Sequence, residues 1–270
     1  MCGITGFSLK INLSQKENVL RIMNDKLSHR GPDGEGFYHD DDVSFAHKRL
    51  AIIDLNSRSN QPFFDKKKEY VIVFNGEIYN FIELKKILTD EGFVFFTSSD
   101  TEVLLNSYIK WGIGLLQKIK GMFSFAIYDK KRKQILCARD HFGQKPFFYY
   151  YNDGNFIFSS ELTSLISNPQ IKKEICIKSI INYLHYDSFV GDSTPLNNCY
   201  KLLPSEYLIF DIKKREIMKK IYWNLNVSKD KHHPKDYYDL FMNKLIISTK
   251  QHLRSDVPIA LYLSGGVDST

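Results

Sequence analysis

The stretch Tyr70-Val71-Ile72-Val73-Phe74-Asn75-Gly76 decides the fold class, because it joins a β-branched and aromatic run to a residue pair that favours tight turns. On this local pattern, Asn75-Gly76 is predicted to form a hairpin turn. Similar runs, bounded by Gly, Asn, Asp or Lys-rich turns, follow at Ser124-Tyr128, Ile135-Ala138, Phe147-Tyr151 and Phe156-Ser159. Together they predict one or two antiparallel sheets.

Amphipathic helices are predicted around these strands. Apolar residues recur three or four positions apart in Val19-Leu27, Phe81-Glu91 and Glu102-Trp111. Because sheets joined by such helices pack in layers, the sequence predicts a layered α+β domain. The lysine-rich stretch Lys213-Lys220 marks a change, so we expect this first domain to span residues 2–210.

Residues 211–270 are predicted to form a linker and the incomplete start of a second domain. A helix pattern runs from about Pro234 to Arg254, and Ile259-Ala260-Leu261-Tyr262-Leu263 then predicts a buried strand of the parallel type. The strand leads directly into Ser264-Gly265-Gly266-Val267-Asp268-Ser269-Thr270, where the sequence stops. We expect the helix and the strand to lack their covering partners.

Composition argues against several classes of protein. The hydrophobic content of 43% is ample for a buried core, and no stretch approaches the roughly 20 apolar residues of a membrane span. We therefore expect a soluble cytoplasmic protein without a membrane partner. The net charge of +6 includes basic clusters in predicted turns, which favour solvated faces over a nucleic-acid site: Lys66-Lys68, Lys130-Lys133 and Lys213-Arg215.

The cysteines show neither the spacing of a zinc site nor the density of a disulfide scaffold, so no metal site is predicted: Cys2, Cys137, Cys176 and Cys199. Cys2 differs from the others because removal of Met1 would give its thiol and an α-amine to one residue. The α-amine has a reference pKa of about 7.7 to 8.0 and can therefore accept the thiol proton near neutral pH. Taken alone, a cysteine at position 2 is more often an ordinary buried residue. We also expect Gly3 and Gly6 to admit a substrate, and Ile4 and Phe7 to share one inward face.

Four further segments give weight to Cys2. They are His29-Arg30-Gly31-Pro32-Asp33-Gly34, His47-Lys48-Arg49-Leu50-Ala51-Ile52-Ile53-Asp54, Phe74-Asn75-Gly76-Glu77-Ile78-Tyr79-Asn80 and Ser99-Asp100-Thr101-Glu102. With Cys2-Gly3-Ile4 they resemble, in order and spacing, the glutaminase domain of asparagine synthetases, a class II glutamine amidotransferase domain. The resemblance implies a four-layer αββα fold of the N-terminal-nucleophile (Ntn) hydrolase type, with Cys2 as the nucleophile that hydrolyses glutamine.

The resemblance also implies roles that differ from the local interpretations. Asn75 and Gly76, locally a turn, would donate hydrogen bonds to the oxyanion of the reaction intermediate. Asp100, locally a helix cap, would hold the α-ammonium of glutamine with Glu77 nearby. Arg49, locally a surface arginine, would grip the α-carboxylate through two parallel hydrogen bonds. Leu50, Ile52 and Ile53 are expected in the core, with their backbone lining the same site. The segment His29-Gly34 is expected to shape the loop over the pocket without chemistry of its own.

The final segment resembles the pyrophosphate-binding loop of ATP pyrophosphatases, an α/β fold of the adenine nucleotide α-hydrolase type, found in the synthetase half of the same family. Its backbone N–H groups would hold phosphate oxygens of ATP, bound with Mg²⁺. The residues implied are Leu263, Ser264, Gly265, Gly266, Asp268 and Ser269.

The acceptor of ammonia would be aspartate, with asparagine as the product. Because the second domain is incomplete, we expect this chain at most to hydrolyse glutamine. The resemblance also leaves room for a homodimer. Two alternatives stay open at this point: an asparagine-synthetase-like enzyme that amidates a sugar or a peptide, and a catalytically silent regulatory or binding module.

Overall fold

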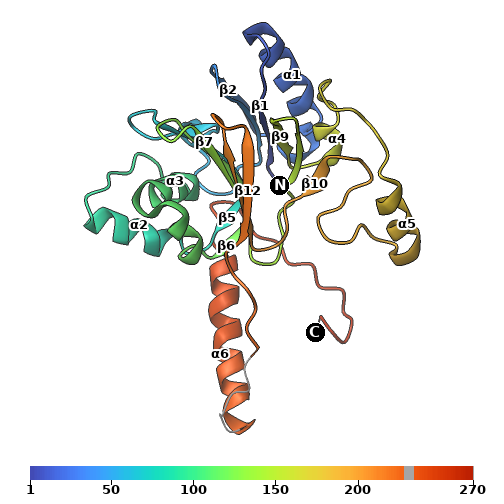
Figure 1. Cartoon of the computed structure of the whole chain (residues 1–270). Helices are drawn as coiled ribbons and strands as arrows, with labels where there is room; N and C mark the ends of the chain where they lie inside the picture. Colours follow the sequence, from blue (N-terminus) through green and yellow to red (C-terminus); the bar gives the residue numbers. More distant parts are fainter. Residues whose placement is uncertain (228–233, 270) are drawn as a thin grey trace.

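The computed structural model describes residues 1–227 and 234–269 and consists mainly of two antiparallel sheets (Figure 1). One six-stranded sheet has the order β10 (Cys199–Lys201), β8 (Phe148–Asn152), β9 (Asn155–Ser159), β1 (Gly3–Ser8), β3 (Ser44–Arg49) and β2 (Gly34–His39). The other six-stranded sheet has the order β12 (Glu216–Ile221), β11 (Glu206–Asp211), β7 (Gln134–Arg139), β6 (Gly121–Asp129), β5 (Tyr70–Ile78) and β4 (Phe63–Phe64). The strands predicted from the sequence are therefore confirmed.

Helices cover the outer faces of both sheets. α1 (Leu13–Asp25) and the short α4 (Leu162–Leu165) pack on the sheet that contains β1, whereas α2 (Phe81–Asp90) and α3 (Asp100–Trp111) lie on the side of β5 (Figure 1). Buried apolar clusters fill the space between the sheets and the two spaces between sheet and helices. This arrangement confirms the predicted four-layer αββα architecture. The smaller α5 (Ile177–Tyr186) lies at the edge of the molecule beyond β10.

Strand β5 shows why its sequence is a continuous apolar run. Val71 and Val73 pack in the core between the sheets, while Ile72 and Phe74 pack beneath α2 and α3. Because successive side chains of a strand point to opposite faces, a strand buried on both faces has no polar alternation.

The predicted hairpin turn at Asn75-Gly76 is wrong. Both residues continue β5, paired with Ser124 and Phe123 of β6, and the pairing runs on to Ile78 and Gly121. The sequence pair favours a turn locally, but the long partner strand keeps the chain extended. Glycine is needed at position 76 because a Cβ there would lie 2.1 Å from the carbonyl oxygen of Met122.

Strand β1 corrects two smaller expectations. Ile4 packs between the sheets and Phe7 packs on the α1 side, so they occupy opposite faces instead of sharing one. A Cβ on Gly3 would lie 2.8 Å from the Cβ of Leu27, and one on Gly6 would lie 2.6 Å from the ring of Phe45. These glycines thus admit neighbouring protein atoms.

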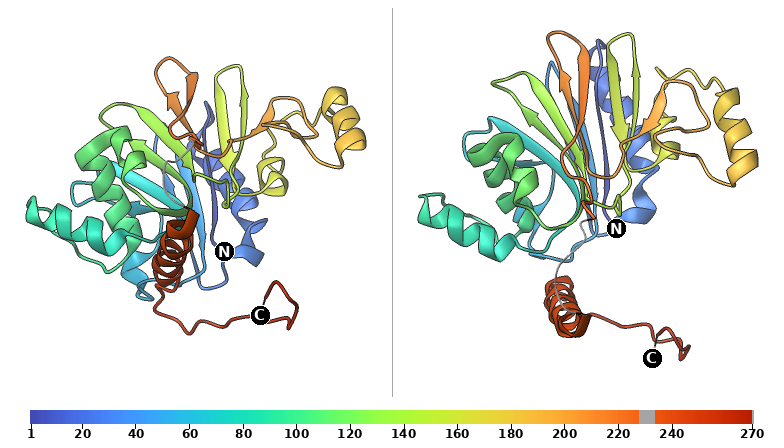
Figure 2. Two further views of the ribbon diagram at one scale, coloured as in Figure 1. Left: turned by 90° about the horizontal axis from the view of Figure 1, so that it is seen from below. Right: turned by 60° about the horizontal axis from the view of Figure 1, so that its bottom comes forward.

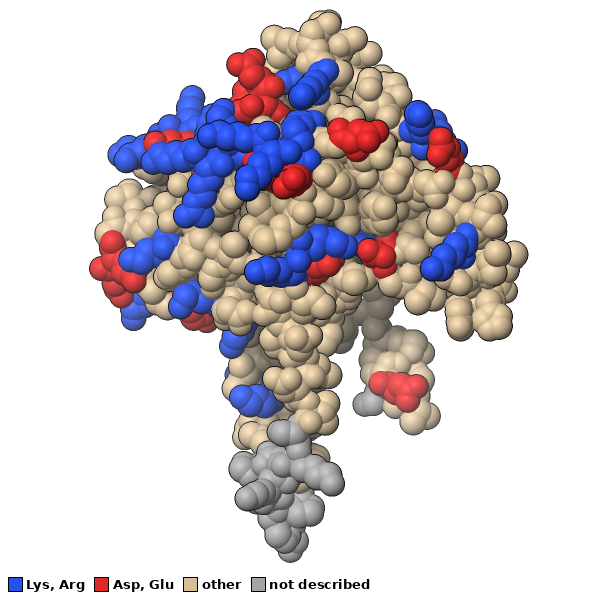
Figure 3. All heavy atoms as spheres, in the orientation of Figure 1, with Lys and Arg blue, Asp and Glu red and all other residues tan. Residues whose placement is uncertain are grey.

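The basic clusters lie in hairpin turns, as predicted. They connect β4 to β5, β6 to β7 and β11 to β12. Lys and Arg side chains gather with acidic ones on the upper part of the face in Figure 3, where hairpins end. Some are paired, for example Lys131 with Glu69 at 2.8 Å. The predicted domain boundary at residue 210 falls inside β11, and the sheet extends beyond it through β12.

The chain after β12 is helical and then irregular. α6 (Pro234–His252) confirms the predicted helix and projects from the end of the sheets (Figures 1 and 2). The predicted buried strand at Ile259-Leu263 is wrong: the segment has no regular structure, and Tyr262 is 99% exposed. A parallel strand needs hydrogen-bonded neighbours, and none of the described strands lies beside this segment. Within the described residues, no helix has the length and apolar character needed to cross a membrane.

We predict that backbone amides of α6 from Tyr237 onward, and those of residues 257–269, exchange with deuterium much faster than those of β5, by on the order of 100-fold or more. The physical reason is that these segments bury little apolar surface, whereas the amides of β5 lie between two paired strands. Hydrogen exchange read by mass spectrometry tests this directly. Equal protection in both regions would show that α6 is covered in solution.

Candidate active site

The predicted glutaminase residues meet in one pocket of about 190 Å³. The pocket lies beside the start of β1, the end of β3, the last residues of β5 and the start of α3. It is lined by Cys2, Arg49, Leu50, Ile52, Ile53, Asn75, Gly76, Glu77 and Asp100. Residues distant in sequence are brought together here because the two sheets pack face to face.

Cys2 lies just before β1 and faces the chain that leaves β3. Its sulfur accepts a hydrogen bond from the backbone N–H of Leu50 at 3.3 Å and lies 3.5 Å from the carbonyl oxygen of the same residue. Burial raises the pKa of the Cys2 thiol, while the hydrogen bond from Leu50 opposes this effect. The thiol therefore needs a nearby base to react at neutral pH.

The N-terminus is held beside the pocket by Arg30. The Nε of Arg30 donates to the carbonyl oxygen of Cys2 at 2.9 Å, and the Nη1 of Arg30 forms an ion pair with Glu161 at 2.8 Å. Burial also lowers the pKa of the α-amino group of Met1, which favours the neutral, basic form of an amine at this place.

Asp33 extends this support by accepting a hydrogen bond from Ala51 N–H at 2.8 Å. The segment His29-Gly34, to which the sequence assigned no chemistry, thus braces both the N-terminus and the chain after Arg49.

Asn75 carries an unused donor. Its Nδ2 is buried and has no hydrogen-bond partner among the described residues. Buried amide groups normally form hydrogen bonds, so a buried donor without a partner in a pocket wall indicates that a bound ligand accepts its hydrogen bond. The neighbouring strand pairing fixes the backbone of Asn75 and Gly76 in place.

Asp100 forms the anionic end of the pocket. The residue that caps α3 is Ser99, whose hydroxyl accepts from Thr101 N–H at 3.1 Å. The carboxylate of Asp100 accepts from Ile78 N–H at 3.0 Å and from the hydroxyl of Ser99 at 3.5 Å, and it lines the pocket. Burial, aided by the charge of Glu77, raises the pKa of Asp100 to about 7.

Arg49 forms the cationic end, and its interpretation as a surface arginine is wrong because it is 7% exposed. Its guanidinium donates to the carbonyl oxygens of Ile53, Asp54 and Asn56 and to Oδ1 of Asn60. Among the described residues it forms no ion pair with a carboxylate. These bonds occupy all terminal N–H groups of the guanidinium, and only the Nε–H remains available. Two parallel hydrogen bonds to a carboxylate therefore require residues 53–60 to release one of the terminal N–H groups.

Several lining residues escaped sequence reasoning. Lys145 is buried, and burial lowers its pKa while the charge of Glu77 opposes that effect. Gln61 joins two walls, since it accepts from Phe74 N–H at 2.6 Å and donates to Thr101 Oγ1 at 3.2 Å. The sequence predicts no role for Lys145, and Gln61 has no recognisable signal.

The residues predicted to bind ATP lie apart from this pocket. Ser264, Gly265, Gly266, Asp268 and Ser269 form an exposed turn in which the hydroxyls of Ser264 and Ser269 are 2.5 Å apart. Leu263 precedes the turn and is 62% exposed. Nothing in the described part of the chain encloses this turn, and no cluster of His, Cys, Asp and Glu suited to a metal ion occurs among the described residues. Their roles toward ATP stay predictions.

Known proteins resemble the chain over its whole length. Residues 1–223 match the family profile described as glutamine amidotransferase domain, and residues 241–270 match that described as asparagine synthase. Asparagine synthetase (glutamine-hydrolyzing) 3 of Bacillus subtilis is 36% identical over 100% of this chain, which spans 44% of that protein. Amidase chry2 of Gibberella zeae is 33% identical over 100% of this chain, which spans 42% of it.

Solved structures agree on the fold. The glutamine phosphoribosylpyrophosphate amidotransferase of B. subtilis superimposes with a TM-score of 0.60 at 20% identity, covering 84% of this chain and 50% of that chain. This likeness confirms the predicted Ntn-type fold. With the layered fold, the pocket and the match over residues 1–223 in agreement, the chain belongs to the glutamine amidotransferase domain family.

Proposed function

We propose that the chain hydrolyses glutamine at Cys2 and that the ammonia released serves the ATP-dependent amidation of aspartate in the whole protein. The observation that carries the proposal is the pocket itself. It places a thiol, an unpartnered amide donor and two opposite charges around one volume of about 190 Å³. Free glutamine has matching groups, namely a carboxamide at one end and a zwitterion at the other.

The reaction begins once Met1 has been removed. The α-amine of Cys2 accepts the thiol proton, and the thiolate attacks the side-chain carbonyl carbon of glutamine. The tetrahedral oxyanion accepts hydrogen bonds from Asn75 Nδ2 and the Gly76 N–H. The C–N bond then breaks, the amine returns the proton to the leaving ammonia, and a thioester remains. Attack by water on the thioester releases glutamate and restores the thiol.

The charged ends of the pocket hold the substrate during these steps. Asp100 attracts the α-ammonium and Arg49 attracts the α-carboxylate, with Glu77 near Asp100 and the backbone of Leu50, Ile52 and Ile53 along the wall. Both contacts also form with glutamate, so they orient the substrate instead of distinguishing it from the product.

The second half of the reaction is proposed from the longer relatives. The match of residues 241–270 and the name of the B. subtilis relative support aspartate as acceptor, with ATP and Mg²⁺ at the turn Ser264-Ser269. The name of the fungal relative, an amidase, differs from that of the B. subtilis relative and keeps open the alternative of another acceptor, such as a sugar or a peptide. A reactive thiol operates in a reducing compartment, so we place the reaction in the cytoplasm.

We predict that Cys2→Ala lowers glutamate release from glutamine by on the order of 1000-fold, because the covalent route is lost. The measurement is glutamate release by purified chain whose mass confirms loss of Met1. Cys176→Ala, which changes another partly exposed thiol, is the matched control and should keep full activity. Protein that retains Met1 should be as inactive as Cys2→Ala. Full release by the Cys2→Ala chain would disprove the role of the thiol.

We predict that glutamine binding weakens as the pH falls below about 7, the pKa of Asp100, by roughly 10-fold per pH unit. Below this pH the free carboxyl is protonated and no longer attracts an ammonium group. Calorimetric titration of the Cys2→Ala chain isolates the effect from the thiol.

Asp100→Asn should bind glutamine roughly 100-fold more weakly at pH 8 and show no such pH dependence. Burial raises the pKa of Glu77 as well, so Glu77→Gln is the control. Its affinity should still fall at acidic pH, but from a lower pH than in the parent chain, because the charge of Glu77 no longer raises the pKa of Asp100. A pH dependence that persists in Asp100→Asn would assign the titration to another group.

A further inference from the structure

We propose that Asp54 is a positioning residue for the two charges that bind an α-amino acid. It ties residues 50–56, here called the Arg49 loop because their carbonyl groups bind the Arg49 guanidinium, to the turn that begins α3. This tie fixes the distance between Arg49 and Asp100. The inference rests on the proposed glutamine site. Asp54 does not line the pocket itself and acts through Arg49 and Asp100.

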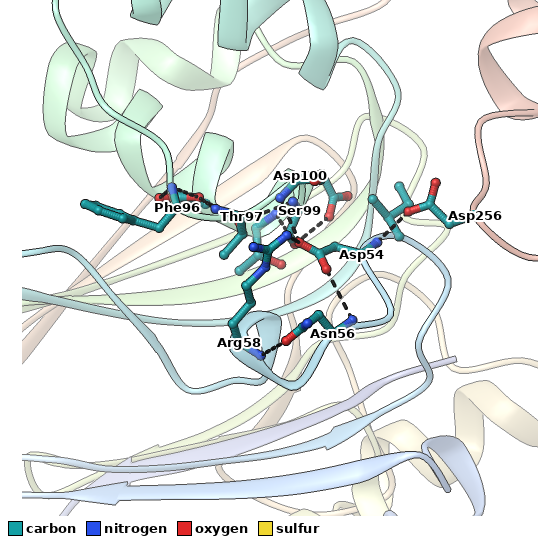
Figure 4. Close-up of polar contacts among 12 residues, drawn as sticks. Asp54, Asn56, Arg58, Phe96, Thr97, Ser99, Asp100 and Asp256 are labelled. Atoms are coloured by element: carbon teal, nitrogen blue, oxygen red, sulfur yellow. Dashed lines mark hydrogen bonds and ion pairs between the residues drawn. The ribbon is translucent and has the colours of Figure 1, made fainter.

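The carboxylate of Asp54 joins two segments that are distant in sequence (Figure 4). One oxygen accepts from Ser98 N–H at 2.7 Å, and the other accepts from Asn56 N–H at 3.2 Å. Arg58 lies 3.6 Å from the same carboxylate, but half of its side chain is exposed and the ion pair adds little. The bond to Ser98 is therefore the main link across the pocket wall.

On one side, this link reaches the cation. The carbonyl oxygen of Asp54 accepts from the guanidinium of Arg49, as do those of Ile53 and Asn56. Asp54 has φ of 49°, in the left-handed region that most residues avoid. A loop with such a residue keeps its shape only when surrounding contacts hold it, and the side chain of Asp54 supplies two of them.

On the other side, the link reaches the anion. Ser98 precedes the cap Ser99 and the pocket residue Asp100. Glu102 holds the preceding turn from within α3, accepting from Phe96 N–H at 3.0 Å and from Thr97 N–H at 2.7 Å. Glu102 fixes this turn to its own helix, whereas Asp54 fixes it to the Arg49 loop. Gln61 ties α3 to β5 instead, through Thr101 and Phe74.

The Asp54 carboxylate is suited to this role because it stays ionised. Burial by itself raises its pKa, but the N–H group of Ser98, the Ser59 hydroxyl, the N–H group of Asn56 and the charge of Arg58 together outweigh burial, so the net shift is downward. Hydrogen bonds from backbone N–H to a carboxylate are stronger than those between neutral groups. Asparagine at this position would keep one acceptor oxygen. Its NH₂ group would face the N–H of Ser98 or of Asn56, so one of the two hydrogen bonds would be lost.

The loop has a further contact on its outer side. Asp256, which follows α6, accepts from Asp54 N–H at 2.7 Å and donates its own N–H to Ile52 O at 3.0 Å (Figure 4). The Arg49 loop is thus held from the pocket side by the guanidinium and from the outside by this segment. Asp54 is the residue at which both sets of contacts meet.

The experiment measures protection of Cys2 from alkylation by iodoacetamide, a reagent without α-amino acid charges. We expect Asp54→Asn to react at the wild-type rate without glutamine, while the glutamine concentration that halves this rate rises by roughly 10- to 100-fold. In steady-state hydrolysis, KM should rise by a similar factor and kcat should change by less than about 3-fold. A merely structural defect would instead alter the alkylation rate and kcat.

Matched variants complete the design. Asp65→Asn removes a carboxylate that likewise accepts two backbone N–H groups, from Lys67 and Tyr70, but in a turn outside the pocket, and it should leave protection unchanged. If Asp54→Asn does not fold, Asp54→Gly tolerates the left-handed φ and removes the carboxylate with the same expected loss. Wild-type protection in either folded Asp54 variant would overturn the inference. Absence of protection in the wild type would instead contradict the proposed function.

Discussion

Face-to-face packing of the two sheets is the constraint on which the pocket depends. Ile4, Phe45, Val71 and Val73 meet in the core between the sheets, and the pocket residues Cys2, Arg49 and Asn75 lie a few residues along the chain from Ile4, Phe45 and Val73. Because these strands pack together, the residues next to them in the chain also come together. Cys2, Asn75 and Arg49 therefore become neighbours although they are distant in sequence. The apolar core determines which strand ends meet, and the polar residues at those ends determine the chemistry.

The polar contacts around the pocket act as a second level of organisation. Arg30 holds the N-terminus, Gln61 ties β5 to α3, and Asp54 ties the Arg49 loop to the same helix. Each of these side chains is largely buried and bonded to backbone groups, which restricts both partners more than a surface ion pair would. Among the pocket residues, Asn75 Nδ2 has no hydrogen-bond partner in the described part of the chain, whereas the terminal N–H groups of Arg49 are occupied by neighbouring oxygens.

Repeated local signals in the sequence predict the strands and helices, whereas features that depend on long-range pairing cannot be predicted from them. The strands, the helices and the four layers follow from periodicity and from the family segments. Asn75-Gly76 was assigned to a turn because a local pattern cannot reveal that β6 continues beside it. Ile259-Leu263 was assigned to a buried strand because its apolar character is real, but strand formation needs neighbours that a run of side chains cannot supply. Gln61 and Asp54 carry no chemical signature of their own, since their importance comes only from what they connect.

The charges in the pocket make the empty site unfavourable and the filled site favourable. Asp100 has a pKa of about 7 in the fold against 3.8 for an exposed carboxyl, a difference that corresponds to roughly 4 kcal/mol. Because the folded pKa is the higher one, this stability is present at low pH and is lost as the pH rises from about 4 through 7. At neutral pH the fold therefore bears much of the cost of a buried anion without a cation beside it. A ligand that brings an ammonium group to Asp100 offsets this cost. With Arg49 available to attract a carboxylate, the pocket favours a zwitterionic amino acid over neutral amides.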